Sequence, residues 1–181
     1  MQWRNDSTRY GAVAVTAHWV VAAAVLGLFV LGSWMVDLTY YHAWYQRGPD
    51  LHRSFGILLL MVMIARVAWR LTDSVPDPVQ GHARIERVVA RLAHGSLYLL
   101  LFVAMASGYL ITTADGSSIS VFGWFDVPSM TGDVDHLEDV AGGVHYWSTL
   151  GLVVLAGVHA LGALKHHWVD RDETLRRMLG L

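Results

Sequence analysis

The chain has 181 residues, of which 54% are hydrophobic and only 15% are charged, and its formal net charge is −2. Soluble domains carry about 25% charged residues, so this composition excludes a disordered chain and a basic nucleic-acid-binding protein. The sequence contains no cysteine. This excludes disulfides, thiolate metal sites, iron–sulfur clusters and haem attached through a C-x-x-C-H motif.

The apolar residues form four long blocks. These blocks cover residues 12–36, 51–71, 88–114 and 140–164. Each is long enough to cross a bilayer, which takes roughly 20 helical residues, and backbone groups in lipid must be paired within the segment. The sequence therefore predicts an all-α fold, an integral membrane four-helix bundle that forms a single domain over residues 1–181. The first block is too long for a cleaved signal peptide, so we expect it to stay in the membrane.

Basic residues are concentrated on one side of the predicted membrane. The tails, the 71–88 connection and the adjoining span ends hold 11 of the 13 basic residues, and the other side holds only Arg47 and Arg53. By the positive-inside rule, both termini are predicted to be cytoplasmic. The opposite side is acidic and carries eight carboxyl groups: Asp37, Asp50, Asp115, Asp126, Asp133, Asp135, Glu138 and Asp139.

Two segments outside the spans have a predicted structure. The 115–139 connection is the longest and is predicted to lie outside, with an ordered turn at 123–128 on the membrane surface. Residues 170–181 are predicted to form a short surface helix whose arginines face anionic lipid. His166 and His167 lie just past the fourth span and are expected at the headgroup level rather than on a metal. His42, His82 and His136 are loop residues that show no partner in the sequence.

Five histidines lie within the spans or at their ends. The predicted topology places His52 and His145 near the outer face and His18, His94 and His159 near the inner face. Ionisable residues inside a membrane are costly and generally mark a functional site.

The spacing of two histidines in the fourth span is the most informative pattern. His145 and His159 are 14 residues apart, which on a helix is a rise of roughly 21 Å with a rotation of about 40°. Both imidazoles therefore point into the bundle, at two depths. His52 can complete the outer site, and either His18 or His94 can complete the inner one.

A pair of histidines from facing helices suits a haem iron better than zinc, which prefers four ligands in a closed tetrahedron. Gly32 and Gly108 each stand 14 residues after a span histidine and would let a porphyrin approach the backbone; ordinary helix packing is the alternative. Arg66 stands 14 residues after His52. It would pair with a haem propionate or extend to the cytoplasmic headgroups.

Seven short motifs carry a resemblance to a known family: Thr-Ala-His-Trp at 16–19, Leu-His-Arg-Ser-Phe-Gly at 51–56, Ala-Arg-Val-Ala-Trp-Arg at 65–70, Ala-His-Gly-Ser-Leu-Tyr at 93–98, Val-His-Tyr-Trp at 144–147, Gly-Val-His-Ala at 157–160 and Lys-His-His-Trp at 165–168. In this order they resemble the bacterial cytochrome b561 family. That family is related to the b-type subunits of formate dehydrogenase and nickel–iron hydrogenase.

The resemblance implies two haem b groups in the bundle core of a bacterial inner-membrane protein that contacts lipid and ubiquinone. It implies that His52 and His145 hold the outer haem iron and that His18 and His159 hold the inner one, which leaves His94 spare. Stand-alone members are similar to oxidoreductases that take electrons from superoxide at the outer face and reduce ubiquinone.

The electron donor is the least determined part of this prediction. An acidic outer face repels an anion on average, but Arg53, with Arg47 and His42 nearby, would form a local basic entrance for superoxide. The first alternative is a cytochrome b subunit that serves a separate dehydrogenase or a periplasmic redox partner. A further alternative is a non-redox membrane transporter or scaffold that bears histidines. No nucleic-acid partner is expected.

Overall fold

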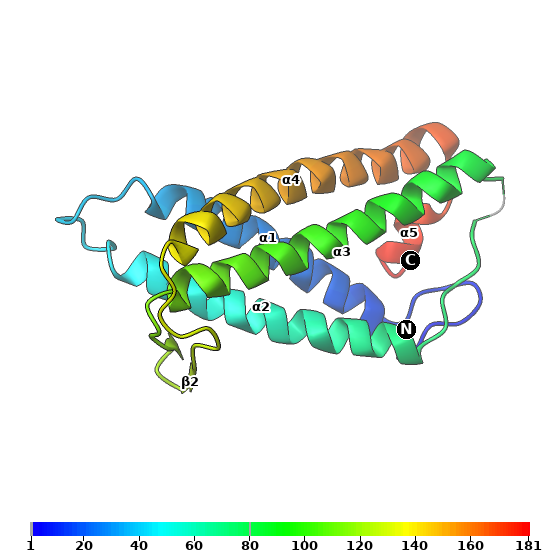
Figure 1. Ribbon diagram of the computed structural model, residues 1–181. Helices are drawn as coiled ribbons and strands as arrows, with labels where there is room; N and C mark the ends of the chain where they lie inside the picture. The colour runs from blue at the N-terminus through cyan, green and yellow to red at the C-terminus, as the bar shows by residue number, and fades with distance from the viewer. Residues whose placement is uncertain (1, 80) are drawn as a thin grey trace. The chain divides into compact units, whose positions relative to one another are not determined.

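The computed structural model describes residues 2–79 and 81–181. Four long helices dominate it: α1 (Ala12–Met35), α2 (Arg47–Thr72), α3 (Arg84–Thr113) and α4 (Leu137–Lys165), shown in Figure 1. Each is long and apolar enough to cross a membrane. The predicted fold class, a helical membrane protein with four spans, is therefore confirmed.

The helices expose large apolar side chains. Val30, Leu99 and Leu161 are each about two-thirds exposed, at 67%, 65% and 66%. In water such surfaces would drive association, whereas in a bilayer they face lipid tails of the same character. The exposed apolar surface is therefore the surface expected of spans in contact with lipid.

Three helices, α2, α3 and α4, begin earlier than the apolar blocks of the sequence. Helix α2 starts at Arg47 and includes Pro49, because a proline in the first helical turn removes only an amide that has no partner within the helix. Helix α4 starts at Leu137, and Glu138 and Asp139 lie in its first turn, where carboxylates interact favourably with the helix dipole.

Each helix contributes one segment to each of two compact units. The first, the His52 unit, comprises residues 23–61 and 99–153. The second, the His18 unit, comprises the described residues of 1–22, 62–98 and 154–181. Each unit therefore contains parts of all four helices, and each is described by itself below.

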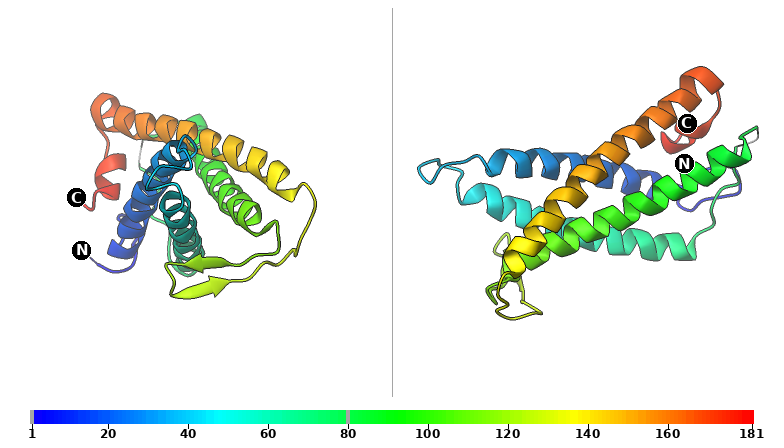
Figure 2. Two further views of the ribbon diagram at one scale, coloured as in Figure 1. Left: turned by 90° about the vertical axis from the view of Figure 1, so that its left-hand side faces the viewer. Right: turned by 45° about the horizontal axis from the view of Figure 1, so that its top comes forward.

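The His52 unit contains a small β-hairpin that the sequence did not predict. Strands β1 (Ile119–Val121) and β2 (Phe125–Val127) pair antiparallel in the connection between α3 and α4 (Figure 2). The turn predicted at 123–128 is part of this hairpin. Ile119 and Val121 pack with Ile57 of α2 in a buried apolar cluster. This packing explains why three-residue strands, too short to be stable alone, are ordered.

A buried hydroxyl on α2 holds the hairpin in place. The Ser54 side chain is 2% exposed, and its Oγ accepts a hydrogen bond of 3.1 Å from the Phe122 backbone amide. Phe122 itself has a φ of 51°, and Gly123 follows with a φ of 72°. Positive φ is uncommon for a residue other than glycine, and here the hydrogen bond from the Phe122 amide to Ser54 of α2 helps to hold it.

In the His18 unit, hydrogen bonds join the C-terminal segment to α1 and to the α2–α3 connection. After α4 come the π-helical turn η1 (His166–Asp170) and the helix α5 (Thr174–Met178), which forms the helical part of the predicted 170–181 segment. Trp19 Nε1 donates a 2.7 Å bond to the Met178 carbonyl. Arg177 Nη1 donates one of 2.9 Å to the Asp77 carbonyl in the α2–α3 connection.

Replacement of Ser54 tests the attachment of the hairpin. Ser54→Ala leaves the Phe122 amide without its acceptor, and we expect a loss of about 1–3 kcal/mol in the stability of the hairpin. Hydrogen exchange followed by mass spectrometry in detergent should show faster exchange over residues 119–127. The control is Ser118→Ala, because Ser118 is exposed. Equal exchange in the two variants would contradict this role of Ser54.

Candidate functional site

The His52 unit brings two span histidines together. His52 on α2 and His145 on α4 face each other, with ring centres 6.2 Å apart and ring planes 81° apart. Both residues stand on long helices, so the separation is fixed by packing and does not depend on a mobile loop. These are the two residues that the sequence assigns to an outer site.

Glycines on the other two helices make room for these rings. A Cβ atom at Gly32 of α1 would lie 3.0 Å from His52 Cε1, and one at Gly108 of α3 would lie 3.0 Å from His145 Cε1. Such contacts are too close for a side chain without displacement of the imidazole. Each glycine therefore creates the space that one histidine ring occupies, so all four helices shape this site.

A hydrogen bond orients the ring of His145. Its Nδ1 lies 2.8 Å from the carbonyl oxygen of Ala104, which can only accept, so Nδ1 is the donor. A neutral imidazole with its proton on Nδ1 presents the lone pair of Nε2, which is the state that a metal ligand needs. His52 Nδ1, in contrast, is buried without a hydrogen-bond partner among the described residues.

The His18 unit contains the second group of span histidines. His18 on α1 and His159 on α4 have ring centres 6.5 Å apart with 66° between their planes. His94 on α3 is closer to His159, at 5.0 Å with 65° between the planes. Both inner candidates from the sequence therefore lie beside His159.

The ring separations distinguish between these histidines. Two imidazoles that bind one metal ion from opposite sides, each through a nitrogen about 2.0–2.1 Å from the metal, have ring centres about 6.3 Å apart. The His52–His145 and His18–His159 pairs match this value, at 6.2 and 6.5 Å, whereas the 5.0 Å of His94–His159 is too short. The residues present fit a metal held axially between two histidines, as in a bis-histidine haem.

Arg66 lies beside the inner pair. Its Nε donates a 3.2 Å hydrogen bond to the Tyr98 hydroxyl, and its Nη2 is 3.4 Å from His18 Nδ1. Its Nη1 is buried without a hydrogen-bond partner among the described residues. A buried guanidinium with an unused donor favours an anionic group nearby, such as the propionate considered from the sequence.

The two arginines of the expected outer entrance border one cleft in the His52 unit. Arg47 and Arg53 line it, together with Trp44, Ser120 and Phe122. Arg53 forms an ion pair with Asp50, which also lines the cleft. The positive charge of Arg53 is therefore partly neutralised. His42, expected nearby, is not among the residues that line this cleft.

One cluster was missed by the sequence reasoning. His82, for which the sequence showed no partner, and His166, which was expected at the headgroup level, both contact Asp172. His82 and Asp172 are 90 residues apart, and no periodic pattern relates a connection to a tail over that distance. The only local signal is that His166 and Asp170 are four residues apart, within one turn of helix.

Comparison with known proteins gives a consistent result over the full chain. The sequence profile described as prokaryotic cytochrome b561 matches residues 9–181. The chain is 49% identical to cytochrome b561 homolog 2 of Escherichia coli over 99% of this chain and 96% of the relative. It is 30% identical to cytochrome b562 of Cereibacter sphaeroides over 94% of each chain. It is 28% identical to the probable superoxide oxidase CybB of Yersinia pestis over 94% of this chain and 96% of the relative.

Alanine at Gly32 tests the close contact with the His52 ring. The added methyl group should displace this imidazole, so we expect Gly32→Ala to destabilise the protein by about 1–3 kcal/mol through overpacking. The control is Gly27→Ala on the same helix, where a Cβ meets nothing within 4 Å and should cost no stability. Thermal unfolding in detergent, followed by circular dichroism, measures both. Equal stability of the two variants would show that the ring has room.

Proposed function

We propose that this chain, which belongs to the prokaryotic cytochrome b561 family, is a two-haem membrane electron carrier that passes electrons from a donor at the outer face to ubiquinone. The observation that carries the proposal is the presence of two histidine pairs with nearly the same separation, 6.2 and 6.5 Å. Membership of a cytochrome family favours electron transfer over the transporter or scaffold alternatives.

The proposed ligands of the two haem irons are His52 with His145 and His18 with His159. When bound, the haem groups would supply one-electron oxidation and reduction, which no side chain of this chain provides. His94 is proposed not to be a ligand, because its ring is too close to His159 for a metal between them. We assign it to packing beside the inner pair.

The surrounding residues would hold these ligands in position. The Ala104 carbonyl accepts a hydrogen bond from His145 Nδ1–H and would so fix the direction of the ring and the tautomer that ligates. Gly32 and Gly108 keep methyl groups away from the outer pair. Arg66 would place a positive charge beside the inner pair, where it would stabilise a propionate.

We propose superoxide as the electron donor. Each superoxide ion would give up one electron and leave as dioxygen, and one ubiquinone would take up two electrons and two protons to become the quinol. The likeness to a relative named as a probable superoxide oxidase supports this choice. The positive charges of Arg47 and Arg53 would draw a small anion into the cleft that they line.

The proposed location is the bacterial inner membrane, with both termini in the cytoplasm. The asymmetric distribution of basic residues supports this orientation. It puts the His52 pair near the outer face, where the donor arrives. Ubiquinone, which is apolar, would exchange electrons within the lipid layer.

A second candidate is electron delivery by a basic partner protein. The acidic residues of the 126–139 connection support it, because five carboxylates in it are exposed: Asp126, Asp133, Asp135, Glu138 and Asp139. Such a surface attracts a partner of opposite charge. Neutralisation of these acids should slow reduction by a partner protein and should not slow reduction by superoxide, which is an anion.

Replacement of the proposed ligands tests the two sites separately. His145→Ala should remove one haem, so haem content per chain, measured as the pyridine haemochrome, should fall from about two to about one. His18→Ala should remove the other haem. The matched control is His94→Ala, which should retain both haems. Two results would contradict the assignment. One is the loss of both haems from a folded His145→Ala protein. The other is the loss of the inner haem from His94→Ala but not from His18→Ala.

Charge changes at the cleft test superoxide as the donor. Stopped-flow reduction of the oxidised protein by superoxide, with ubiquinone as acceptor, should slow about tenfold in Arg53→Glu and should slow as salt is added. Asp50→Asn should increase the rate, because it frees Arg53 from its ion pair.

The control for these variants is Arg87→Glu, which makes the same charge change at an exposed residue of the predicted cytoplasmic side. Its rate should equal that of the wild type. The double variant Arg47→Glu/Arg53→Glu gives the decisive comparison, provided that it retains its haems. If superoxide reduces the wild type no faster than this variant, superoxide is excluded as the donor and the partner-protein candidate is favoured.

A further inference from the structure

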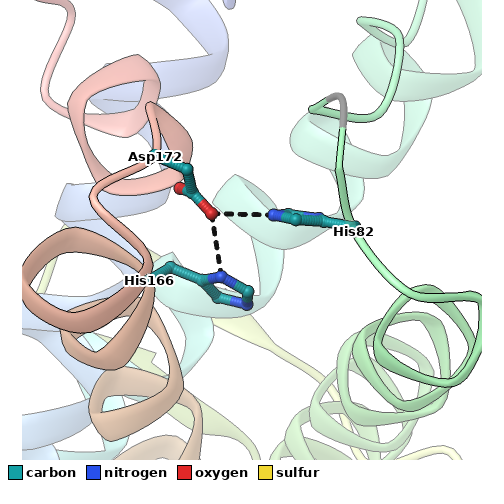
Figure 3. Close-up of side chains that lie close together, drawn as sticks. All are labelled: His82, His166 and Asp172. Carbon is teal, nitrogen blue, oxygen red and sulfur yellow. Dashed lines mark hydrogen bonds and ion pairs between the residues drawn. The ribbon is translucent and has the colours of Figure 1, made fainter.

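The His18 unit also contains a cluster of two histidines and an aspartate, side chains of the types that bind metals. These residues lie outside the four long helices. His82 lies in the α2–α3 connection, His166 begins η1, and Asp172 follows η1. Figure 3 shows both imidazoles directed at the same carboxylate oxygen. His82 Nε2 is 2.8 Å and His166 Nδ1 is 2.9 Å from Asp172 Oδ2.

A second carboxylate contacts only one member of this group. Asp170 Oδ2 is 2.8 Å from His166 Nδ1, so two carboxylates converge on one imidazole nitrogen. The side chains of His82, His166 and Asp172 are only 17%, 18% and 12% exposed, so these three are largely shielded from water. Two imidazole nitrogens and one carboxylate are a donor set that zinc accepts.

The backbone brings these donors together by an unusual local structure. Helix α4 ends in the π-helical turn His166–Asp170, and Arg171 adopts a left-handed conformation with a φ of 54°. A non-glycine residue at positive φ is uncommon and persists where the surroundings hold it. This reversal turns Asp172 back toward His166, and the Asp172 amide bonds the His166 carbonyl at 3.1 Å.

The charges of the cluster favour a divalent cation. Lys165 Nζ is 2.6 Å from Asp170 and 3.0 Å from Glu86. The carboxylates of Glu86, Asp170 and Asp172 with the Lys165 ammonium carry a net charge of about −2 when the imidazoles are neutral, and one zinc ion would cancel it. Lys165 would then keep Glu86 as its partner.

Asp172 is a carboxylate at neutral pH. Burial raises the pKa of Asp172, but hydrogen bonds from Thr174 and from His82 lower it by more, so the pKa lies well below its ordinary value.

We propose that His82, His166 and Asp172 form a zinc site that clamps the α2–α3 connection to the segment after α4. In a tetrahedral site the ligand atoms stand about 3.3 Å apart, so the observed separations of 2.8 Å (His82–Asp172) and 2.9 Å (His166–Asp172) would need to open by only about half an ångström. The site joins two parts of the chain that are 90 residues apart in sequence. Its function is structural, because the bound ion would tie these two parts together.

Zinc binding by the full-length protein tests the proposal. The protein, purified in detergent with an affinity tag that contains no histidine, is treated with EDTA and titrated with zinc against a chromophoric chelator. We expect one saturable zinc per chain. X-ray absorption at the zinc edge should report two imidazoles and oxygen ligands.

The variants separate this site from other histidines. His82→Gln and Asp172→Asn should each weaken zinc binding by at least about tenfold, since loss even of a group that only supports a ligand costs 10–100-fold. The control is His136→Ala, which removes an exposed histidine and should bind zinc as the wild type does. The visible absorption spectrum and circular dichroism, unchanged from the wild type, show that each variant is folded.

Proteolysis gives a readout that does not depend on the variants. Zinc should slow tryptic cleavage at Arg84, at the end of the clamped connection, by at least about tenfold in the wild type. A structural site should bind zinc with a dissociation constant below about 100 μM. The absence of saturable binding at this zinc concentration would overturn the proposal. Binding that His82→Gln and Asp172→Asn both leave unchanged would also overturn it, and the cluster would then be a hydrogen-bonded clamp only.

Discussion

The structure depends on one constraint: polar imidazoles within apolar spans must be held and compensated by the helices around them. Lipid offers no hydrogen bonds, so a histidine in a span is costly unless a partner is present. In the His52 unit all four helices contribute: α2 and α4 supply the rings, and glycines of α1 and α3 provide the space. The Ala104 carbonyl of α3 accepts a hydrogen bond from His145 Nδ1. The glycines and the histidines are therefore parts of one packing solution.

The same constraint explains why the ring separations are informative. His94 and His159 have ring centres 5.0 Å apart. The His52–His145 and His18–His159 pairs stand farther apart, at 6.2 and 6.5 Å, close to the separation of two imidazoles that share a metal ion. Because the helices fix the separation, such sites would be preorganised for a metal, which would lower the entropy cost of binding.

The four spans and the pairing of their histidines could be predicted from the sequence because both depend on helix geometry. The 14-residue interval between His145 and His159 places both on one face of any straight helix. The choice between His18 and His94 could not be made in this way, because both stand at similar depth beside His159. The side-chain separations that distinguish them depend on helix packing, which a single sequence does not encode in any local pattern. The β1–β2 hairpin was missed for a related reason, since its strands have three residues each and depend on Ile57 of another element.

The His82 cluster shows the limit of sequence analysis most clearly. Each of its histidines, taken alone, is an ordinary residue in a connection or a tail. Their relation to Asp172 arises from a π-helical turn and a left-handed Arg171, neither of which has a reliable sequence signature. The span histidines could be found because an ionisable residue in a span is costly and generally marks a functional site. A histidine outside the spans carries no such signal. Polar clusters outside the membrane must therefore be sought from the structure, where convergence on a single carboxylate oxygen is the sign that the residues act together.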